Sequence, residues 1–268
     1  MKEVNPVSMA FDRAASGYDH DLDLQGEIFR RFRAVLWRTM YHVLDPAGPL
    51  VELGCGSGED TLFLAQTGHQ VVATDPSAGM LEVTRQKLLR AGLLHRVELI
   101  QASAGQLPSL LGDTFRWRGA ISNLGPLNCE PAMPEVATWL AKSMAPGSHL
   151  VMSPMAAISP WEISLFLAKA KPGRALVRLR PGWVPVPVGE VSVSTSYPFP
   201  STWKALFSPH FERVATRGLG VFLPPPYVTG MARHPHWLNL LEELDNRFAH
   251  HWPWRWLGDH HLMVWRRR

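Results

Sequence analysis

The spacing of hydrophobic positions changes along this chain. Between Ile28 and Leu44 they recur every three or four residues with arginines among them, which predicts an amphipathic helix ending before Pro46. Further on, short apolar runs alternate with helical patterns. Because helices separate the runs, they predict a parallel sheet with helices on both faces. The expected strands are 50–53, 70–74, 97–100, 120–123 and 149–153.

The pattern is less regular outside this central part. The polar segment 11–25 predicts irregular structure or short helices. Residues 172–200 are rich in Pro, Gly, Val and Ser, and the alternating runs 184–188 and 191–196 predict a β-hairpin turning at Gly189-Glu190. Two final strands, at 211–222 and 261–265 around a helix at 236–249, are typical of an antiparallel sheet edge.

Composition narrows the class of protein. With 46% hydrophobic and 19% charged residues, the chain can bury a core. No apolar run approaches the roughly 20 residues that cross a bilayer, and residues 1–10 lack a signal-peptide core, so we expect a cytoplasmic protein without a membrane span. Cys55 and Cys129 are too few for a disulfide framework or a four-ligand zinc site, and the histidines lack metal-ligand spacing. We expect no metal.

Charge is distributed unevenly. Residues 1–150 carry a net charge of −3 and residues 151–268 a net charge of +7. The basic part could meet an acidic substrate, a nucleic acid or a membrane surface. Its arginines are scattered except at Arg266-Arg267-Arg268, which favours a solvated face, and we do not expect a nucleic-acid partner.

A glycine-rich turn follows the first predicted strand and precedes a helix. It reads Glu52-Leu53-Gly54-Cys55-Gly56-Ser57-Gly58. Glycines let the backbone turn sharply and approach a ligand closely, and open α/β sheets bind ligands at the carboxyl ends of their strands. We therefore expect a cofactor to contact this turn, at Glu52, Gly54, Cys55 and Gly56.

Spacing and charge distinguish between cofactors. A dinucleotide motif is GxGxxG, but here the third glycine comes one residue early, at Gly58, and Glu59 follows it. A negative charge there opposes a pyrophosphate, whereas Glu52 suits an ammonium group. S-adenosylmethionine has an ammonium group and no phosphate. Asp75 ends the second strand, where a carboxylate can accept hydrogen bonds from both ribose hydroxyls. Apolar surface for adenine would come from Pro76 and Met80.

Two motifs of this chain resemble those of class I S-adenosylmethionine-dependent methyltransferases. They are Glu52 to Gly58 and Thr74-Asp75-Pro76-Ser77-Ala78-Gly79-Met80-Leu81. The nearest resemblance is to enzymes of ubiquinone and menaquinone biosynthesis and to the carboxyl O-methyltransferases of biotin synthesis. The segment Phe11-Asp12-Arg13-Ala14-Ala15-Ser16-Gly17-Tyr18-Asp19 is similar to their FDxxAxxYD segment, which implies that Tyr18 lies over the cofactor. The resemblance covers about residues 9–155. It implies a Rossmann-like α/β fold with a seven-stranded mixed sheet of order 3-2-1-4-5-7-6.

The chain departs from this family after the third strand. Where the family has Gly-Asp-Ala, this chain has Ala102-Ser103-Ala104, so an uncharged hydroxyl would accept from the adenine amino group. We place Ser103, Ala104 and Asn123 in the expected cofactor site. The segment 122–130 is not the Asp/Asn-Pro-Pro-aromatic motif of amino-methylating nucleic-acid enzymes. It also lacks the paired-glutamate loop of protein arginine methyltransferases.

We accordingly interpret the chain as one methyltransferase domain. Its parts are a helical N-terminal cap (1–45), a cofactor-binding core (46–154), an acceptor-side insertion after strand five containing the β-hairpin (155–205), and the last strands and helix (206–268). The abundant aromatic residues of the second half predict a small, largely apolar or aromatic methyl acceptor.

The residues that would assist catalysis are less well defined. Because a sulfonium is already a good leaving group, methyl transfer needs mainly proximity and desolvation, and sometimes a base. His20, in the cap, and Glu130, after strand four, are the candidate bases. An RNA or DNA methyltransferase that uses the basic half, and a non-catalytic cofactor-binding protein of this fold, remain alternatives. The methyl acceptor, the atom methylated and the oligomeric state stay open.

Overall fold

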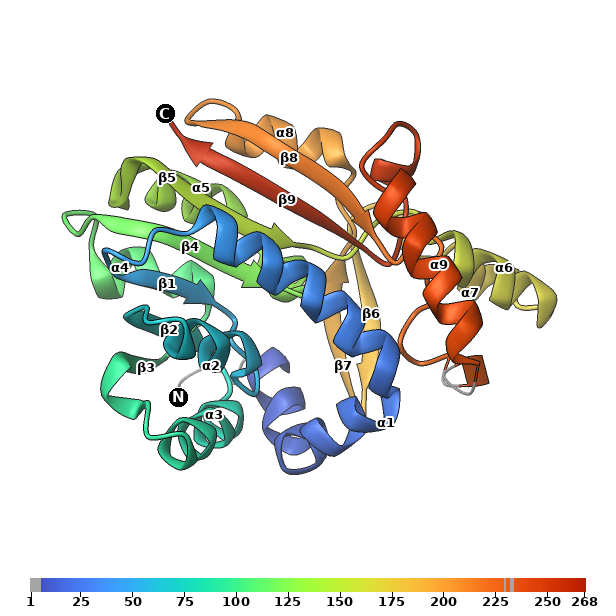
Figure 1. Cartoon of the computed structure of the whole chain (residues 1–268), viewed down its shortest axis with the longest axis horizontal. Helices are drawn as coiled ribbons and strands as arrows, with labels where there is room; N and C mark the ends of the chain where they lie inside the picture. Colours follow the sequence, from blue (N-terminus) through green and yellow to red (C-terminus); the bar gives the residue numbers. More distant parts are fainter. Residues whose placement is uncertain (1–5, 229, 232–233) are drawn as a thin grey trace.

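The computed structural model describes the backbone of residues 6–228, 230–231 and 234–268, and their side chains except those of 19–25. Seven strands form one sheet. They are β1 (Leu50–Leu53), β2 (Val71–Asp75), β3 (Val97–Gln101), β4 (Trp117–Asn123), β5 (Met144–Ser153), β8 (Phe211–Leu219) and β9 (His260–Arg267). Their order is β3-β2-β1-β4-β5-β9-β8 (Figure 1). Because β8 and β9 are the sixth and seventh strands of this sheet, the predicted order is confirmed.

Strand direction gathers the functional residues at one edge. The strands from β3 to β5 are parallel, and β9 runs antiparallel to both β5 and β8. The carboxyl ends of β1, β2 and β4 therefore lie together, with the amino end of β9 beside the end of β5. An isolated bridge between Met155 and His260 extends the pairing past β5.

Helices cover both faces of the sheet, as the alternation predicted. Side chains alternate along each strand, so Val51 and Leu53 face one hydrophobic cluster while Leu50 faces the other. The first cluster includes residues of α5 and α8, and the second includes residues of α1, α2, α3 and α9. These helices and the short α4 are α1 (Pro6–Val43), α2 (Glu59–Gln66), α3 (Ala78–Arg90), α4 (Leu107–Leu111), α5 (Met133–Ser143), α8 (Pro200–Phe207) and α9 (Pro235–Phe248).

The N-terminal cap is more helical than its polar sequence predicted. Residues 6–43 form α1, which bends at Gly26, where φ is 45° and ψ is −118°. The second half of α1 packs on the sheet through Ile28, Phe32 and Leu36, which are almost completely buried. The first half contacts α3 (Figure 1). The sequence pattern did not predict a helix here, because hydrogen bonds, rather than a broad apolar stripe, help to hold the first half of α1.

The insertion after β5 contains the predicted hairpin. Its strands are β6 (Trp183–Val188) and β7 (Val191–Ser196). Two helices precede it, α6 (Pro160–Ala168) and α7 (Pro172–Ala175), in a stretch for which the sequence pattern predicted no helix. These helices and α8 are short and begin with proline, so they show little helical periodicity. Among the described residues, no helix combines the length and apolarity needed to cross a membrane.

Candidate active site

The glycine turn after β1 has left-handed backbone conformations at all three glycines. Gly54, Gly56 and Gly58 have φ values of 75°, 53° and 80°. A Cβ on Gly54 would lie 2.3 Å from a carbon of Pro126, and one on Gly58 would lie 2.4 Å from a carbon of Thr84. A Cβ on Gly56 would meet nothing within 4 Å. Packing therefore requires two of the glycines, whereas Gly56 leaves open space beside the turn.

Asp75 lies next to this open space at the end of β2. Its Oδ2 accepts a 2.9 Å hydrogen bond from the backbone N–H of Gly56, and its Oδ1 accepts one of 2.9 Å from the N–H of Ser77. Burial raises the pKa of Asp75 to about 6, although both hydrogen bonds oppose this shift. The site thus has a carboxylate fixed between the glycine turn and α3.

Glu52 is a second carboxyl group at this edge and is only 2% exposed. Its Oε2 accepts a 2.6 Å hydrogen bond from the hydroxyl of Thr61. Burial, reinforced by the charge of Asp60, raises the pKa of Glu52 to about 8. A ligand ammonium group beside this carboxyl would reverse the shift, because an opposite charge favours ionisation.

Asp60, in the first turn of α2, joins the core to the cap and was not singled out from the sequence. Its Oδ1 accepts hydrogen bonds from Trp37 at 2.6 Å and Arg33 at 3.0 Å, and its Oδ2 accepts one of 3.0 Å from the side-chain amide of Asn123. The Glu59-Asp60 pair directly after the glycine motif was the available sequence signal. Which of the two carboxylates faces inward depends on the docking of α1.

Asn123 takes part in this network, and its expected contact with the cofactor stays a prediction. Its amide nitrogen contacts Asp60 and the sulfur of Met40, and its Oδ1 accepts from the hydroxyl of Ser153 at 3.3 Å. The side chain therefore has partners inside the protein, which position it at the end of β4.

Met80, in the first turn of α3, is only 1% exposed in this structure, and its expected contact with adenine stays a prediction. Pro76 is partly exposed and keeps that role as a prediction. The Cys55 side chain is buried, and its backbone N–H donates to Thr74 at 2.9 Å, so this residue supports the turn through its main chain.

The carboxylate of Glu130 is held by backbone groups, and its role as a general base stays a prediction. Its Oε2 accepts from the N–H of Gly105 at 2.8 Å, and its Oε1 accepts from the N–H of Ala132 at 2.9 Å. Both oxygens are thus used to join the loop after β3 to the start of α5. The loop itself turns at Ser103, whose N–H donates to the Gln106 side chain at 2.9 Å, and Ala104 is buried beside it.

The first half of α1 covers this edge. The Oδ1 of Asp12 accepts from the hydroxyl of Ser77 at 2.6 Å and from the N–H of Gly79 at 2.9 Å. Tyr18 is partly exposed and meets Phe11 edge-on, with ring centroids 6.3 Å apart. His20 lies in this helix, but its side chain is outside the described residues, so its proposed role as a base stays a prediction.

The hairpin and the loop after β4 adjoin the cap. β7 contacts α1, and an exposed 3.9 Å ion pair joins Arg13 to Glu190 at the hairpin turn. Asn128 is fully buried and donates to the carbonyl of Ser196 at 2.7 Å, while its Oδ1 accepts from the N–H of Met155 at 2.8 Å. The N-terminal cap, the loop after β4 and the hairpin are therefore brought together.

A buried charged group extends this region beyond β5. Arg178 donates to Asp259 Oδ1 at 2.8 Å and pairs with Glu162, and its guanidinium lies 5.4 Å from the ring centre of Tyr197. Despite burial, Arg178 and His260 hold the pKa of Asp259 well below its usual range. His260 Nδ1 lies 3.2 Å from Asp259 Oδ2. No local sequence pattern marks this group, because Arg178 and Asp259 are 81 residues apart in the chain.

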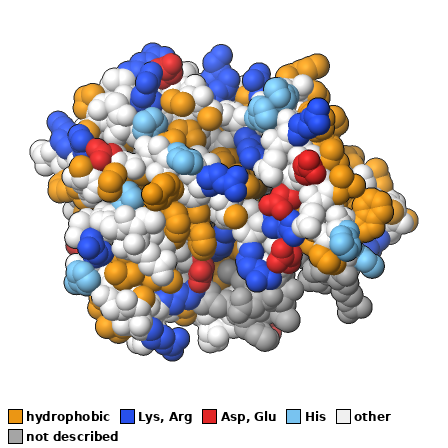
Figure 2. Space-filling view, viewed as in Figure 1, with side chains coloured by type: hydrophobic (Ala, Val, Ile, Leu, Met, Phe, Trp, Pro, Cys, Tyr) orange, Lys and Arg blue, Asp and Glu red, His pale blue; other side chains and the backbone are white. Residues whose placement is uncertain are grey.

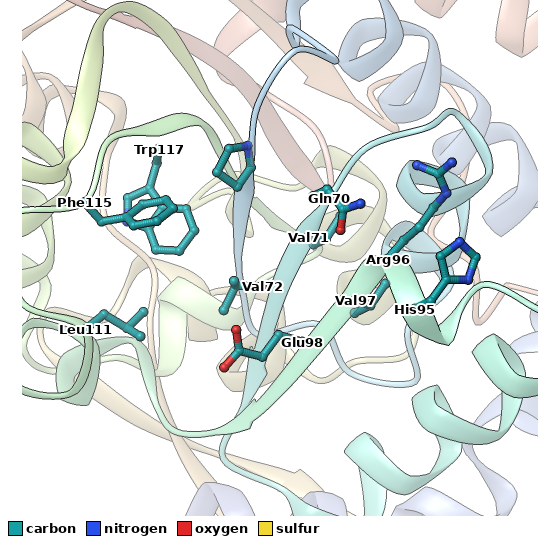
Figure 3. Close-up of a pocket in the computed structure, with 11 residues that line it drawn as sticks. Gln70, Val71, Val72, His95, Arg96, Val97, Glu98, Leu111, Phe115 and Trp117 are labelled. Carbon is teal, nitrogen blue, oxygen red and sulfur yellow. The ribbon is translucent and has the colours of Figure 1, made fainter.

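A cavity of about 460 Å³ lies elsewhere, at the amino ends of β2, β3 and β4. Figure 3 shows the rings of Phe115 and Trp117 at one end and the side chains of His95 and Arg96 at the other. Because Asp75 and the glycine turn lie at the opposite strand ends, this cavity is separate from the candidate site. The described residues contain no group of three His, Cys, Asp or Glu side chains able to hold a metal ion.

The seven-stranded sheet, the glycine turn after β1 and the carboxylate at the end of β2 are arranged as in class I S-adenosylmethionine-dependent methyltransferases, which this chain resembles. Consistent with this, residues 50–146 match a family model described as a methyltransferase domain.

Individual relatives agree on this class. The chain is 36% identical to a demethylmenaquinone methyltransferase of Clavibacter sepedonicus over 110 residues, 40% of this chain and 42% of that protein. It is 29% identical to a trans-aconitate 2-methyltransferase of Paracidovorax citrulli over 172 residues, 58% of this chain and 64% of that protein. Both alignments thus cover less than two thirds of the relative.

A solved structure extends the fold similarity to nearly the whole chain. The CcbJ methyltransferase of Streptomyces caelestis superposes with a TM-score of 0.61 at 14% identity, covering 98% of this chain and 99% of that one. The insertion and the last two strands therefore belong to an architecture found in another methyltransferase.

Proposed function

We propose that this protein transfers the methyl group of S-adenosylmethionine to a small, largely apolar or aromatic metabolite. The observation that carries the proposal is Asp75, whose carboxylate is held against the open side of Gly56 by two backbone hydrogen bonds. The relatives named as acting on demethylmenaquinone and trans-aconitate support a small-molecule acceptor.

The residues present fit this cofactor. When bound, S-adenosylmethionine supplies a methyl group on a positively charged sulfur. Asp75 would accept hydrogen bonds from the ribose hydroxyls, and Glu52 would be ionised by the ammonium group. The turn at Gly54–Gly58 approaches the ligand through its backbone, and Pro76 with Ser103 and Ala104 would border the adenine.

The acceptor would bind between the first half of α1, the loop after β4 and the hairpin β6–β7. Asn128 holds the loop and the hairpin in contact, and the Arg13–Glu190 pair adds a contact between hairpin and cap. Such a cover excludes water from the transfer, which matters for a weak nucleophile.

A proton acceptor is needed if the acceptor atom carries a proton. With Glu130 occupied by backbone N–H groups, His260 is the better candidate on this side. Its Nδ1 lies 3.2 Å from Asp259 Oδ2, and this contact positions the ring beside the carboxylate. Arg178 in turn holds Asp259 in place.

The direct test uses S-adenosylmethionine labelled in the methyl group. We expect calorimetric binding of S-adenosylmethionine and S-adenosylhomocysteine but not of NAD or NADP, and label transfer to quinol-type or carboxylic metabolites but not to bulk tRNA. Tight NAD binding would contradict the cofactor assignment. Transfer to tRNA would instead support the nucleic-acid alternative, and cofactor binding without transfer to any acceptor would support the non-catalytic one.

Deletion of the hairpin tests the acceptor cover. Replacing 184–196 by two glycines should leave S-adenosylmethionine affinity nearly unchanged and abolish turnover. Because Val184 and Val193 are buried, a second variant, Asn128→Ala, separates the hairpin from the loop with less risk to folding. A folded variant that methylates its acceptor at the parent rate would show that the hairpin is not the cover.

A further inference from the structure

The helix α6 is strongly apolar but only partly covered by the rest of the protein, with six of its nine residues half-buried and three exposed. Only Glu162 and Ser164 of its nine residues are polar, yet none of its residues is buried. A helix that is apolar all round normally lies inside a protein or a bilayer. In Figure 1, α6 and α7 lie at one end of the molecule, away from the central sheet, and Figure 2 shows hydrophobic side chains at that end.

Large apolar side chains continue through the next turns of chain. Leu167, Leu176, Leu179 and Trp183 are each between 39% and 53% exposed. α6 contacts α7, and Arg174 of α7 lies over the ring of Phe166 in α6, 5.6 Å from its centre. The exposed apolar residues therefore belong to one connected part of the surface, which we call the 160–183 surface.

Cations are interleaved with these apolar residues. Lys169, Lys171, Arg174 and Arg180 are all exposed, and no residue from 163 to 189 is Asp or Glu. In the described part of the chain, no carboxylate pairs with any of these four groups. Arg178, the remaining cation of the segment, points inward to Asp259 and Glu162.

We propose that the 160–183 surface binds an anionic lipid bilayer at its interface. Leucine and tryptophan side chains insert at the level of the headgroups while lysine and arginine pair with lipid phosphates. Charge complementarity selects this occupant. A second copy of the same surface would place four cations against four cations, and a nucleic acid would leave the leucines without a partner.

The 160–183 surface adjoins the proposed acceptor site, which suggests how lipid binding would serve the reaction. The 160–183 surface leads directly into β6 of the hairpin, and its Arg178 holds Asp259 beside His260 on the acceptor side. An apolar acceptor dissolved in the bilayer would then reach the site without crossing water. This last step rests on the proposed function, whereas lipid binding itself does not.

Vesicle flotation tests the proposal without any acceptor. The intact chain should bind vesicles of phosphatidylcholine with 30% phosphatidylglycerol and should bind pure phosphatidylcholine far more weakly. Each cation near an anionic surface contributes about fivefold to binding. Replacing Lys169, Lys171, Arg174 and Arg180 by Gln should therefore weaken binding by roughly several hundredfold, and Leu167→Ser with Leu176→Ser should also reduce it.

A matched control removes four exposed cations elsewhere, with Arg85, Arg90, Lys142 and Lys204 replaced by Gln. This variant has the same net charge, so we expect it to bind vesicles within a few-fold of the parent. Equal losses in both variants, or equal binding to the two vesicle types, would overturn the proposal. A dimer in sedimentation that the first variant abolishes would assign the surface to a second copy instead.

Calorimetry with S-adenosylmethionine on the same proteins separates this proposal from the proposed function. Normal cofactor affinity without vesicle binding contradicts only the lipid surface. Vesicle binding without cofactor affinity contradicts only the methyltransferase function.

Discussion

The carboxylate of Asp12 in α1 accepts a 2.6 Å hydrogen bond from the hydroxyl of Ser77, the residue that caps α3. Ser77 also donates its N–H to Asp75, so one residue contacts both the cap and the candidate ribose-binding carboxylate. The position of the N-terminal helix and the geometry of the cofactor site are thus connected through a single turn.

Replacing Asp12 by Ala should loosen the cap. The change removes hydrogen bonds from Ser77 and Gly79, each contributing about 1 kcal/mol, so hydrogen exchange across 7–18 should accelerate and S-adenosylmethionine affinity should fall severalfold. Glu190→Ala, which removes only an exposed ion pair, is the control and should change little. Equal exchange rates in the parent and Asp12→Ala would contradict the connection.

The cap should also respond to acid. Burial opposes the charge of Asp12, but hydrogen bonds from Ser77 and Gly79 outweigh it and lower the pKa of this carboxyl. Because the pKa of Asp12 is lower in the folded state, its hydrogen bonds contribute their full stability above the pKa of an unfolded aspartate. That contribution is lost as pH falls through the lowered pKa of the folded state.

Asp75→Asn should reduce S-adenosylmethionine affinity by roughly ten- to a hundredfold, because hydrogen bonds to charged groups contribute about 1.5–3 kcal/mol. Since the pKa of Asp75 is about 6, affinity in the parent should decline below pH 6. The effect on stability has the opposite sign. A raised folded-state pKa stabilises the chain at low pH, and that contribution is lost as pH rises through about 6. Unchanged affinity in Asp75→Asn would show that another residue holds the ribose.

The three glycines should respond differently to alanine. Gly54→Ala and Gly58→Ala add both left-handed strain, about 1–2 kcal/mol, and a clash with Pro126 or Thr84, so their melting temperatures should fall most. Gly56→Ala adds strain without a clash and should mainly reduce cofactor affinity. A melting temperature as low for Gly56→Ala as for the other two would contradict an open space at this turn.

The variant Glu130→Gln distinguishes a structural role of Glu130 from a role as general base. Glutamine keeps one acceptor oxygen, so the variant should lose stability modestly and keep most of its kcat, whereas Glu130→Ala leaves two N–H groups without a partner and should melt well below it. Loss of kcat in a stable Glu130→Gln, with a changed pH profile, would restore the role of a base.

Arg178→Met should strongly destabilise the chain. The change leaves the buried carboxylate of Asp259 and the partly buried carboxylate of Glu162 without their shared cation, and breaking a buried pair in this way costs about 3–5 kcal/mol. Arg180→Met, two residues away and exposed, is the matched control and should unfold at the same denaturant concentration as the parent. Similar midpoints for both variants would mean that Arg178 does not support the insertion.

The core of the fold was predictable because its elements have clear local patterns. Strands β1 to β5 are short buried runs between helices, and Gly54–Gly58 with Asp75 has a specific spacing. The hairpin was also predictable, since alternation and Gly189 mark it locally. Helices α6 and α8 were missed because they are short, and the first half of α1 because long-range hydrogen bonds help to hold it.

The site was predictable only in part. Glu130, Asn123 and Met80 were assigned from their distance to a motif, but their side-chain directions depend on contacts with residues far along the chain. Asp60 with Arg33, and Arg178 with Asp259, join positions separated by 27 and 81 residues. No local pattern reports such pairs.

The place of β9 in the sheet has a consequence for biosynthesis. This strand is made after β5 and β8 but lies between them. While the ribosome is still extending the chain, the parallel strands with the glycine turn can already pair, whereas β8 has no neighbour until β9 emerges. Residues 259–260 emerge at the same late moment. A nascent chain can therefore assemble its cofactor-binding part well before the part that would bind the methyl acceptor.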